Sequence, residues 1–419
     1  MTTGRKKIAA RPRSREFNIA GSIIPEEHYH VDLRPTLKKL MHLVDKRKYF
    51  VINRPRQFGK TTVLNFLAKH LLKSKTYLPI QISFEGYGEK PDLSMEAFYQ
   101  IFWQKILRYL NAVGMPLAWA PQEERVEIGA FQFQENIRAF CEAVLPKKSV
   151  LLVDEVDSIP RTAVISFLRA LREMYLERTR MPAFHAVALA GVHDIKNLKA
   201  QYRDETQAIG SASPFNIAID YELPAFSRKN IRQYYSLHTE ATGQEFDDEV
   251  LDRVYEVTNG HPWLVSVLAK LLVEKIVPKR KQRIRPAHTE SAIQDLLNST
   301  NSNFDSLFKN ARNPNLFPIV LDLLEGKQRR YNIQNDAIRL GVKYGIFAVK
   351  DRQLILANLI YTQALFKLFE GELEGFGIEE LVASLRFEER NNDVDFRRVL
   401  DKSQVKTSKL QRNLKRQPP

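Results

Sequence analysis

Two short polar stretches in this chain combine residue types that act together on phosphate groups and metal ions. The first is Gly59-Lys60-Thr61 and the second is Asp154-Glu155. A lysine can reach the terminal phosphates of a nucleotide, and a threonine hydroxyl and an aspartate can hold Mg²⁺ with its water shell. A glutamate can polarise the water that attacks the γ-phosphate. These residues predict a nucleotide site with Lys60 and Glu155 as catalytic residues and Thr61 and Asp154 as metal ligands.

The elements around the first stretch suit this chemistry. An apolar, β-branched run at residues 50–52 precedes it, and apolar residues recur at helical spacing after it, which predicts a strand, a loop and a helix. The loop N–H groups and the N-terminus of such a helix point at phosphates, and the helix dipole favours their charge. The residues expected to contact the nucleotide here are Arg56, Gln57, Phe58, Gly59, Lys60, Thr61 and Thr62.

The loop departs from the usual P-loop pattern G-x-x-x-x-G-K-[ST] at one position. Arg54 stands where the first glycine is expected. Glycine lets the backbone approach phosphate closely, so the substitution bears directly on the geometry of the loop. By itself, the stretch could also be a chance Gly-Lys-Thr at the head of an ordinary helix.

The second stretch favours the nucleotide interpretation. Four apolar residues at 150–153 predict a strand buried on both faces, and this strand ends in Asp154-Glu155. The alternative is a buried strand followed by a solvated acidic turn. A strand of this kind about a hundred residues after Gly-Lys-Thr is the second half of a P-loop ATPase signature, and the coincidence predicts nucleotide binding.

A third polar tip follows another buried run, at residues 185–190. It contains His193 and Asp194, which are candidates for groups that sense the γ-phosphate. The alternative for Asp194 is a cap on the next helix. Strands alternating with helices predict an α/β fold with a parallel sheet, and ligands bind such sheets at the carboxyl ends of the strands. All three polar tips fall at that edge.

The chain beyond Ser227 has a helical pattern as far as residues 345–357. Apolar residues there flank the polar turn Lys350-Asp351-Arg352, which predicts a β-hairpin. Helices followed by a hairpin indicate a winged-helix domain. Such domains insert a helix into the DNA major groove or serve as plain interaction modules, and the sequence favours neither.

Composition limits the class of protein. Hydrophobic residues make up 44% of the 419 residues and charged residues 27%, which is typical of a globular chain. Apolar runs are too short to span a membrane, no signal-peptide segment follows Met1, and Cys141 is the single cysteine, so a cytoplasmic location without membrane association is expected. The net charge of +15 predicts contact with a polyanion, nucleic acid first. The alternative is a general contribution to solubility, because part of the charge lies in the terminal segments.

Several further short segments occur along the chain together with these motifs, in a fixed order. They are Gly-Ser-Ile-Ile-Pro (21–25), Ser-Pro-Phe-Asn (213–216), Thr-Gly-Gln (242–244), Gly-His-Pro-Trp-Leu-Val (260–265) and Ala-Asn-Leu-Ile-Tyr (357–361). Together they resemble the bacterial AAA-like ATP-binding proteins, which are close to the STAND and archaeal-type ATPases. The resemblance covers roughly residues 17–370. It implies an ASCE-type core with the catalytic-acid strand beside the P-loop strand, a helical lid whose Pro262 packs on the nucleotide, and a winged-helix domain.

The sequence thus predicts an ATP-binding and ATP-hydrolysing molecular switch that uses Mg²⁺, binds ATP and ADP and forms a nucleotide-dependent homo-oligomer. The alternative is a nucleic-acid-binding regulator, acting through the basic arm, the tail or the winged helix, or a scaffold in which the nucleotide is mainly structural. The expected parts are a basic arm (1–16), a P-loop ATPase core (17–225), a helical lid (226–300), a winged-helix domain (301–370) and a charged basic tail (371–419).

Overall fold

The computed structural model describes residues 15–87, 94–115, 130–191 and 215–370. The chain forms two compact units, and each is discontinuous in sequence. The helical unit joins the segment before residue 33 to residues 225–299, and the sheet unit joins residues 33–224 to the chain from residue 300 onward. Residues 17–32 are predicted from sequence to belong to the ATPase core, whereas their contacts group them with the helices that follow residue 225.

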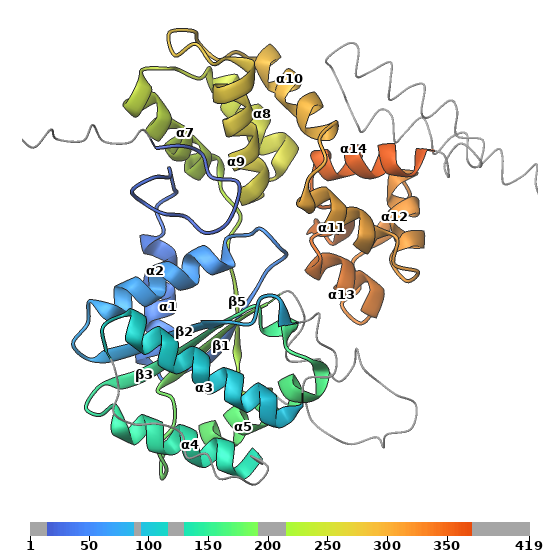
Figure 1. The fold of residues 1–419 in the computed structure, drawn as a ribbon. Coiled ribbons are helices and arrows are strands. Elements are labelled where there is room, and N and C mark those ends of the chain that lie inside the picture. Colours follow the sequence, from blue (N-terminus) through green and yellow to red (C-terminus); the bar gives the residue numbers. More distant parts are fainter. Residues whose placement is uncertain (1–14, 88–93, 116–129, 192–214, 371–419) are drawn as a thin grey trace, which may run out of the picture. The chain divides into compact units, whose positions relative to one another are not determined.

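A five-stranded parallel sheet forms the centre of the sheet unit (Figure 1). Its elements are α1 (Arg34–Asp45), β1 (Tyr49–Asn53), α2 (Lys60–Leu72), β2 (Tyr77–Ser83), α3 (Met95–Ala112), α4 (Ala130–Ala143), β3 (Lys148–Asp154), the 3₁₀ turn η2 (Val156–Ser158), α5 (Arg161–Glu177), β4 (Ala186–Gly191) and β5 (Ile219–Glu222). The strand order is β2-β3-β4-β1-β5. The predicted α/β fold with a parallel sheet is therefore confirmed.

One expectation about this sheet is wrong. The acidic strand β3 does not lie beside the P-loop strand β1, because β4 lies between them and pairs in parallel with both. All six residues of β4 are buried, and small side chains such as Ala186, Ala188 and Ala190 let helices pack closely over it. A strand without any polar face suits the middle of a sheet.

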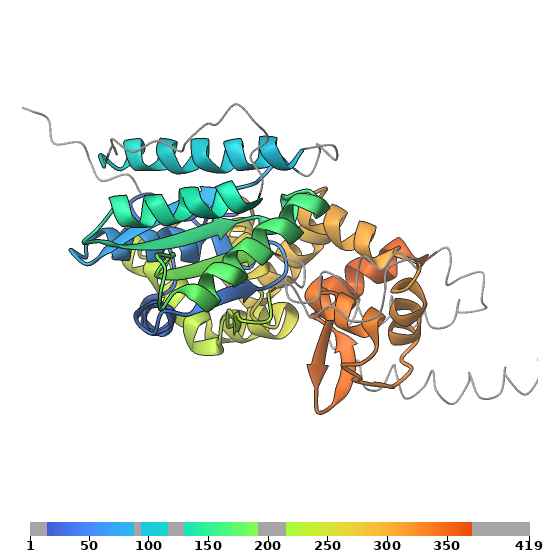
Figure 2. The same ribbon diagram turned by 90° about the horizontal axis from the view of Figure 1, so that it is seen from below.

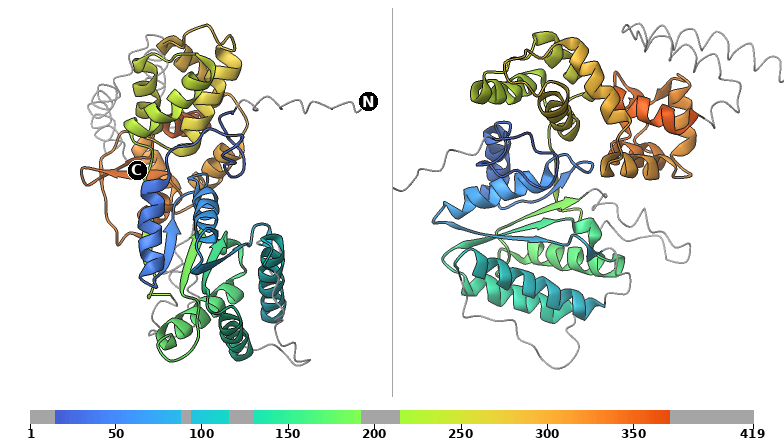
Figure 3. Two further views of the ribbon diagram at one scale, coloured as in Figure 1. Left: turned by 90° about the vertical axis from the view of Figure 1, so that its left-hand side faces the viewer. Right: turned by 45° about the horizontal axis from the view of Figure 1, so that its top comes forward.

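Alternate strand residues point into two separate cores, as the two-residue period of a strand requires. On one face, Val51, Leu151 and Leu189 pack with the aromatic helices α3, α4 and α5. On the other face, Ile52 and Leu152 pack with α1 and α2. Figure 3 shows the sheet edge-on between these two layers. The sheet is thus covered on both faces, and its polar residues gather at the strand ends.

The rest of the sheet unit is a smaller α/β part at residues 300–370. It contains α11 (Ser302–Ala311), α12 (Phe317–Leu324), β6 (Arg329–Arg330), α13 (Asp336–Lys343), β7 (Phe347–Lys350), β8 (Gln353–Leu356) and α14 (Leu359–Leu368). The predicted hairpin is present as β7 and β8, seen in orange in Figure 2. Its two turn residues, Asp351 (φ 51°) and Arg352 (φ 63°), are left-handed, as a tight hairpin turn requires. β6 adds a third antiparallel strand next to β8.

The helical unit contains α7 (Arg228–Thr242), α8 (Asp248–Thr258), α9 (Pro262–Lys270), the π-helical turn η4 (Leu271–Ile276) and α10 (Pro286–Leu297). Ser227 and Asn230 form a capping box that begins α7. The N-terminal segment packs on α7 through Phe17, whose ring centroid lies 5.0 Å from that of Tyr29 and 5.1 Å from that of Tyr234. The Trp263 indole N–H donates to Ile19 O at 3.0 Å. This segment is therefore part of the helical unit's core.

No helix within the described ranges is long and apolar enough to cross a membrane.

Candidate nucleotide-binding site

The loop between β1 and α2 turns sharply at its end. Gln57 (φ 59°) and Gly59 (φ 81°) are both in the left-handed region. Gly59 is the N-cap of α2, and no side chain caps the helix there. The N–H groups of the first turn of a helix have no intrahelical partner, so they remain available to an anion. The local fold thus provides the loop and helix N-terminus that the sequence predicts.

Lys60 lies underneath this loop. Its side chain is buried, with 6% of the residue exposed. Lys60 Nζ donates to Arg54 O and to Pro55 O, both at 2.8 Å. Burial lowers the pKa of Lys60, and the charges of Glu155, Asp157 and Asp154 oppose that effect. Lys60 therefore stabilises the loop through its two hydrogen bonds, and it places a buried positive charge close to the acidic end of β3.

Asp154, the last residue of β3, lies next to the first turn of α2. It is 3% exposed, and its carboxylate is hydrogen-bonded to the Thr61 side chain and, at 3.0 Å, to the Glu155 backbone N–H. Burial raises the pKa of Asp154, while the hydrogen bond from Thr61 lowers it. The sheet brings together a hydroxyl and a carboxylate, hard oxygen ligands of the kind that Mg²⁺ prefers.

Glu155 adopts a backbone conformation that is unusual for its residue type. Its φ of 51° and ψ of 43° place it in the left-handed region, directly before η2. That conformation costs about 1 kcal/mol for a non-glycine residue, and such strain is typical of functional sites. Burial and the neighbouring Asp157 and Asp154 raise the pKa of Glu155. Its half-buried carboxyl thus has a raised proton affinity, as a general base requires.

Asp157 belongs to the same acidic group, although sequence reasoning gave it no role. Its Oδ1 is buried and has no hydrogen-bond partner among the described residues. Gly191, the last residue of β4, lies against it, because a Cβ built on Gly191 would be 2.6 Å from that oxygen. The Asp-Glu-x-Asp spacing was the available signal, since η2 brings Asp157 back toward the end of β3.

Arg54, at the position of the missing glycine, is not in the left-handed region. Its guanidinium pairs with Glu222 (NH1 to Oε1, 2.9 Å) and donates from Nε to Leu223 O at the end of β5. It also lies over the Phe58 ring, with the guanidinium carbon 4.7 Å from the ring centroid. The Arg54 side chain is therefore engaged with β5 and Phe58, and the loop keeps its shape without glycine there.

The loop also contacts the C-terminal part of the sheet unit. Asn303 Nδ2 donates to Gln57 Oε1 at 2.6 Å, and Gln57 Nε2 donates to Ser302 Oγ at 3.4 Å. A Cβ on Gly345 would lie 2.6 Å from Pro55 Cγ, so the backbone there packs directly on the loop. These partners lie far from the loop in the sequence, so no local sequence pattern predicted the contacts.

The other predicted site residues are placed as follows. Arg56 is exposed, and Thr62 lies in the first turn of α2. Pro262 is the first residue of α9 in the helical unit, after the N-cap His261, so its contact with nucleotide stays a prediction. His193 and Asp194 lie outside the described residues.

Comparison with known proteins gives the class of this chain. The family model of the AAA-like domain matches residues 20–366, so the chain belongs to the AAA-like domain family. Among solved structures, it is similar to the Walker-type ATPase PABY2304 of Pyrococcus abyssi, with a TM-score of 0.57 and 12% identity over 85% of this chain and 99% of that one. This likeness shows that the fold is that of P-loop ATPases.

Two other solved structures match more loosely. The ORC2 protein of Aeropyrum pernix has a TM-score of 0.45 and 14% identity, covering 82% of this chain and 95% of that one. The RuvB branch-migration motor of Thermotoga maritima has a TM-score of 0.41 and 13% identity, covering 81% and 95%. No curated protein matches the chain.

Proposed function

We propose that the protein binds ATP with Mg²⁺ and hydrolyses it, and that it works as a molecular switch. The observation that carries the proposal is the convergence of Lys60, Thr61, Asp154 and Glu155. The first two begin α2, Asp154 ends β3 and Glu155 follows it, and the four residues are joined by the Thr61–Asp154 hydrogen bond and by charge interactions. An ordinary helix start has no reason to bury a lysine next to three carboxylates, because each buried charge costs free energy.

Binding would use the loop and the lysine. The backbone N–H groups from Arg56 to Thr62 would surround the phosphates, and Lys60 would contact the β- and γ-phosphates, exchanging its carbonyl partners for phosphate oxygens. Within the described chain no group of three or more His, Cys, Asp or Glu is arranged to hold a metal ion. Thr61 and Asp154 fit Mg²⁺ nonetheless, because this ion commonly takes one or two protein ligands and completes its shell with phosphate oxygens and water. Pro262 is proposed to pack on the nucleotide.

Glu155 would act on the attacking water. Its carboxylate accepts a proton from the water as the water oxygen bonds to the γ-phosphorus and the bond to the β–γ bridging oxygen breaks, which yields ADP and phosphate. Asp157 would keep the proton affinity of Glu155 high through its negative charge. Lys60 would stabilise the charge that develops on the transferred phosphoryl group.

The switch would act through partners of the loop. The Gln57–Asn303 hydrogen bond and the Pro55–Gly345 contact join the loop to residues 300–370. A nucleotide can shift this part only if it interacts differently with two states, and a loop that contacts both phosphate and α11 offers such a difference. Movement of the helical lid and a nucleotide-dependent homo-oligomer in the cytoplasm belong to the same proposal.

The test is ATP turnover by the full chain with Mg²⁺ and with a chelator, with Lys60→Ala as the variant. Lys69→Ala is the matched control, because Lys69 is an exposed lysine on the same helix. We expect Mg²⁺-dependent turnover that Lys60→Ala abolishes and Lys69→Ala leaves intact. Nucleotide retained without turnover in the unmutated chain would favour the scaffold alternative. Absence of both binding and turnover would refute the proposal.

A second candidate function is nucleic-acid binding by the three-stranded sheet at residues 329–356. Arg330 and Lys350 both pair in register with Gln353, so their side chains share one face of this sheet. Both are exposed, as is Arg352 in the hairpin turn, and none of the three forms an ion pair with a described residue. By contrast, Arg329 on the other face is paired with Asp322. A row of unpaired cations suits a phosphate backbone.

This function is tested by duplex DNA binding at several salt concentrations. We expect affinity to fall steeply with salt, and Arg330→Gln with Lys350→Gln to flatten that dependence by roughly two phosphate contacts. Lys327→Gln is the control, because Lys327 is already paired with Asp322 and Glu325. Affinity that does not change with salt would rule this function out.

A further inference from the structure

We propose that Arg54 is a positioning residue that fastens the phosphate-binding loop to the end of β5, so that nucleotide binding and the order of this strand end are coupled. The proposal rests on nucleotide binding at Lys60. It explains the one position at which the loop departs from the P-loop pattern.

The first step is what Arg54 contacts. Its guanidinium pairs with Glu222 at 2.9 Å and donates from Nε to Leu223 O, so it reaches both the side chain and the main chain of the β5 end. A planar guanidinium with several fixed donors can make both contacts at once, which a lysine ammonium does less well. The Arg54 guanidinium also lies over the Phe58 ring, and this contact helps to hold the guanidinium in place.

The second step is what Arg54 carries on its backbone. Its carbonyl oxygen is one of the two acceptors of Lys60 Nζ, at 2.8 Å. Arg54 therefore contacts the end of β5 through its side chain. Through its carbonyl it contacts Lys60, the lysine that is proposed to bind phosphate. A change in the partners of Lys60 reaches the β5 end through one residue.

The third step is where β5 leads. Among the described strands it lies at the edge of the sheet and pairs with β1 alone, and Glu222 lies opposite Asn53 in that pairing. The first segment of the sheet unit ends at Pro224, and the chain enters the helical unit at Ala225. The residues that Arg54 holds are thus the last ones of the core before the lid begins. A strand end with one neighbour and exposed side chains is readily frayed unless something secures it.

The experiment combines nucleotide affinity with backbone hydrogen exchange in the full chain. The probe is a fluorescent ATP analogue with Mg²⁺, and exchange is followed at residues 219–226 with and without it. The decisive variant is Arg54→Gly, which restores the consensus glycine. Arg54→Lys keeps the positive charge but lacks the planar guanidinium group. Glu222→Gln removes the charge of one exposed partner of Arg54 with little risk to folding. Glu142→Gln, at an exposed acid on α4, is the matched control.

We expect nucleotide to slow exchange at residues 219–226 in the unmutated chain. Arg54→Gly should weaken binding by about tenfold, speed exchange there without nucleotide and remove the nucleotide-dependent protection. Arg54→Lys should behave in between, and Glu222→Gln should shift affinity in the same direction by about twofold. Glu142→Gln should match the unmutated chain.

Two results would overturn the inference: Arg54→Gly binding as tightly as the unmutated chain, or residues 219–226 keeping their exchange rates in that variant. Failure of the proposed function looks different. In that case the unmutated chain binds no nucleotide, while faster exchange at residues 219–226 in Arg54→Gly still reports the fastening by itself.

Discussion

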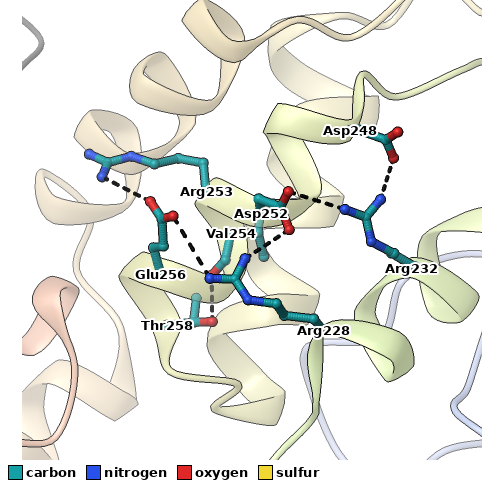
Figure 4. A network of polar contacts seen from close by, with 8 residues as sticks. All are labelled: Arg228, Arg232, Asp248, Asp252, Arg253, Val254, Glu256 and Thr258. Carbon is teal, nitrogen blue, oxygen red and sulfur yellow. Dashed lines mark hydrogen bonds and ion pairs between the residues drawn. The ribbon is translucent and has the colours of Figure 1, made fainter.

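The charged residues of the helical unit and those at the strand ends of the sheet unit are of the same kinds but differ in their surroundings. In the helical unit, Arg228 and Arg232 of α7 reach Asp252 of α8 at 2.8 and 3.1 Å, and Arg253 of α8 reaches Glu290 of α10 at 2.7 Å. Figure 4 shows the part of this ladder between α7 and α8. All these groups are at least partly exposed, and each cation lies beside an acid.

At the strand ends of the sheet unit, by contrast, the charged groups are largely buried. Lys60 and Asp154 are buried, Glu155 is half-buried in a strained conformation, and one oxygen of Asp157 has no hydrogen-bond partner among the described residues. Exposed ion pairs contribute at most about 1 kcal/mol each, whereas buried charges lower stability unless they are fully satisfied. The comparison indicates that the exposed ion pairs add little to the stability of the helical unit, and that the buried charges at the sheet edge lower stability, as the proposed chemistry would require.

Glu155→Gln gives the largest expected effect. The amide keeps the shape of the side chain but cannot accept a proton, so turnover should fall by about a hundredfold or more while nucleotide affinity changes by less than about threefold. Single-turnover hydrolysis and equilibrium titration of the same sample measure the two quantities. An equal loss in both would mean that Glu155 supports binding rather than the attacking water.

Gly260→Ala tests whether packing, rather than the ion ladder, holds the helical unit together. Gly260 has a φ of 71°, its carbonyl accepts from Phe226 N at 2.8 Å, and a Cβ would lie 2.0 Å from Phe226 O. The clash and the left-handed backbone should together cost roughly 2–4 kcal/mol. Hydrogen exchange in residues 226–299 reports this loss, and unchanged protection would show that the ladder carries more of the stability than we infer.

Asp157→Asn should change the pH dependence of turnover. In the proposed mechanism Glu155 acts as a base only when ionised, so its raised pKa predicts that activity is lost as pH falls through a value above the usual one for glutamate. Removing the charge of Asp157 lowers that pKa, so the acid limb of the profile should move to lower pH. A profile of kcat/KM against pH measures this. A shift to higher pH would contradict the proposed role of Asp157.

Arg232→Gln should have the smallest effect. Arg232 pairs with Asp248 and Asp252 at the surface of α7 and α8, so its loss should cost less than about 1 kcal/mol and should not alter turnover. Urea unfolding in low and high salt measures the cost, which should shrink as salt screens the pairs. A loss of unfolding free energy as large as that expected for Gly260→Ala would contradict the inference that the exposed ion pairs add little stability.

Much of this fold could be predicted from local patterns. The strand, loop and helix around Lys60, the buried run before Asp154 and the capping residue Ser227 are each set by neighbours within a few positions. The order of strands is not local. Sequence patterns did not show that β4 separates β1 from β3, because that order depends on which side of the sheet each crossover helix packs.

The candidate site divides in the same way. The four residues Lys60, Thr61, Asp154 and Glu155 could be singled out because each ends or begins a regular element, and the structure brings them together. Asp157 requires the turn of η2 to return to the site. The partners Leu223 of Arg54 and Asn303 of Gln57 come from elements that only the tertiary fold brings near the loop.

The discontinuity of the helical unit has a consequence for how the chain folds as it is made. Phe17 and its neighbours leave the ribosome before the parallel sheet, yet the rings that enclose them, Tyr234 and Tyr235, are synthesised only after the whole sheet. Closing a flexible loop of roughly 200 residues costs conformational entropy that grows with the logarithm of its length. If the sheet folds first, it draws residues 33 and 224 toward each other and shortens that loop. Folding of the sheet before α7 is complete would thus lower the entropy cost of joining the N-terminal segment to α7.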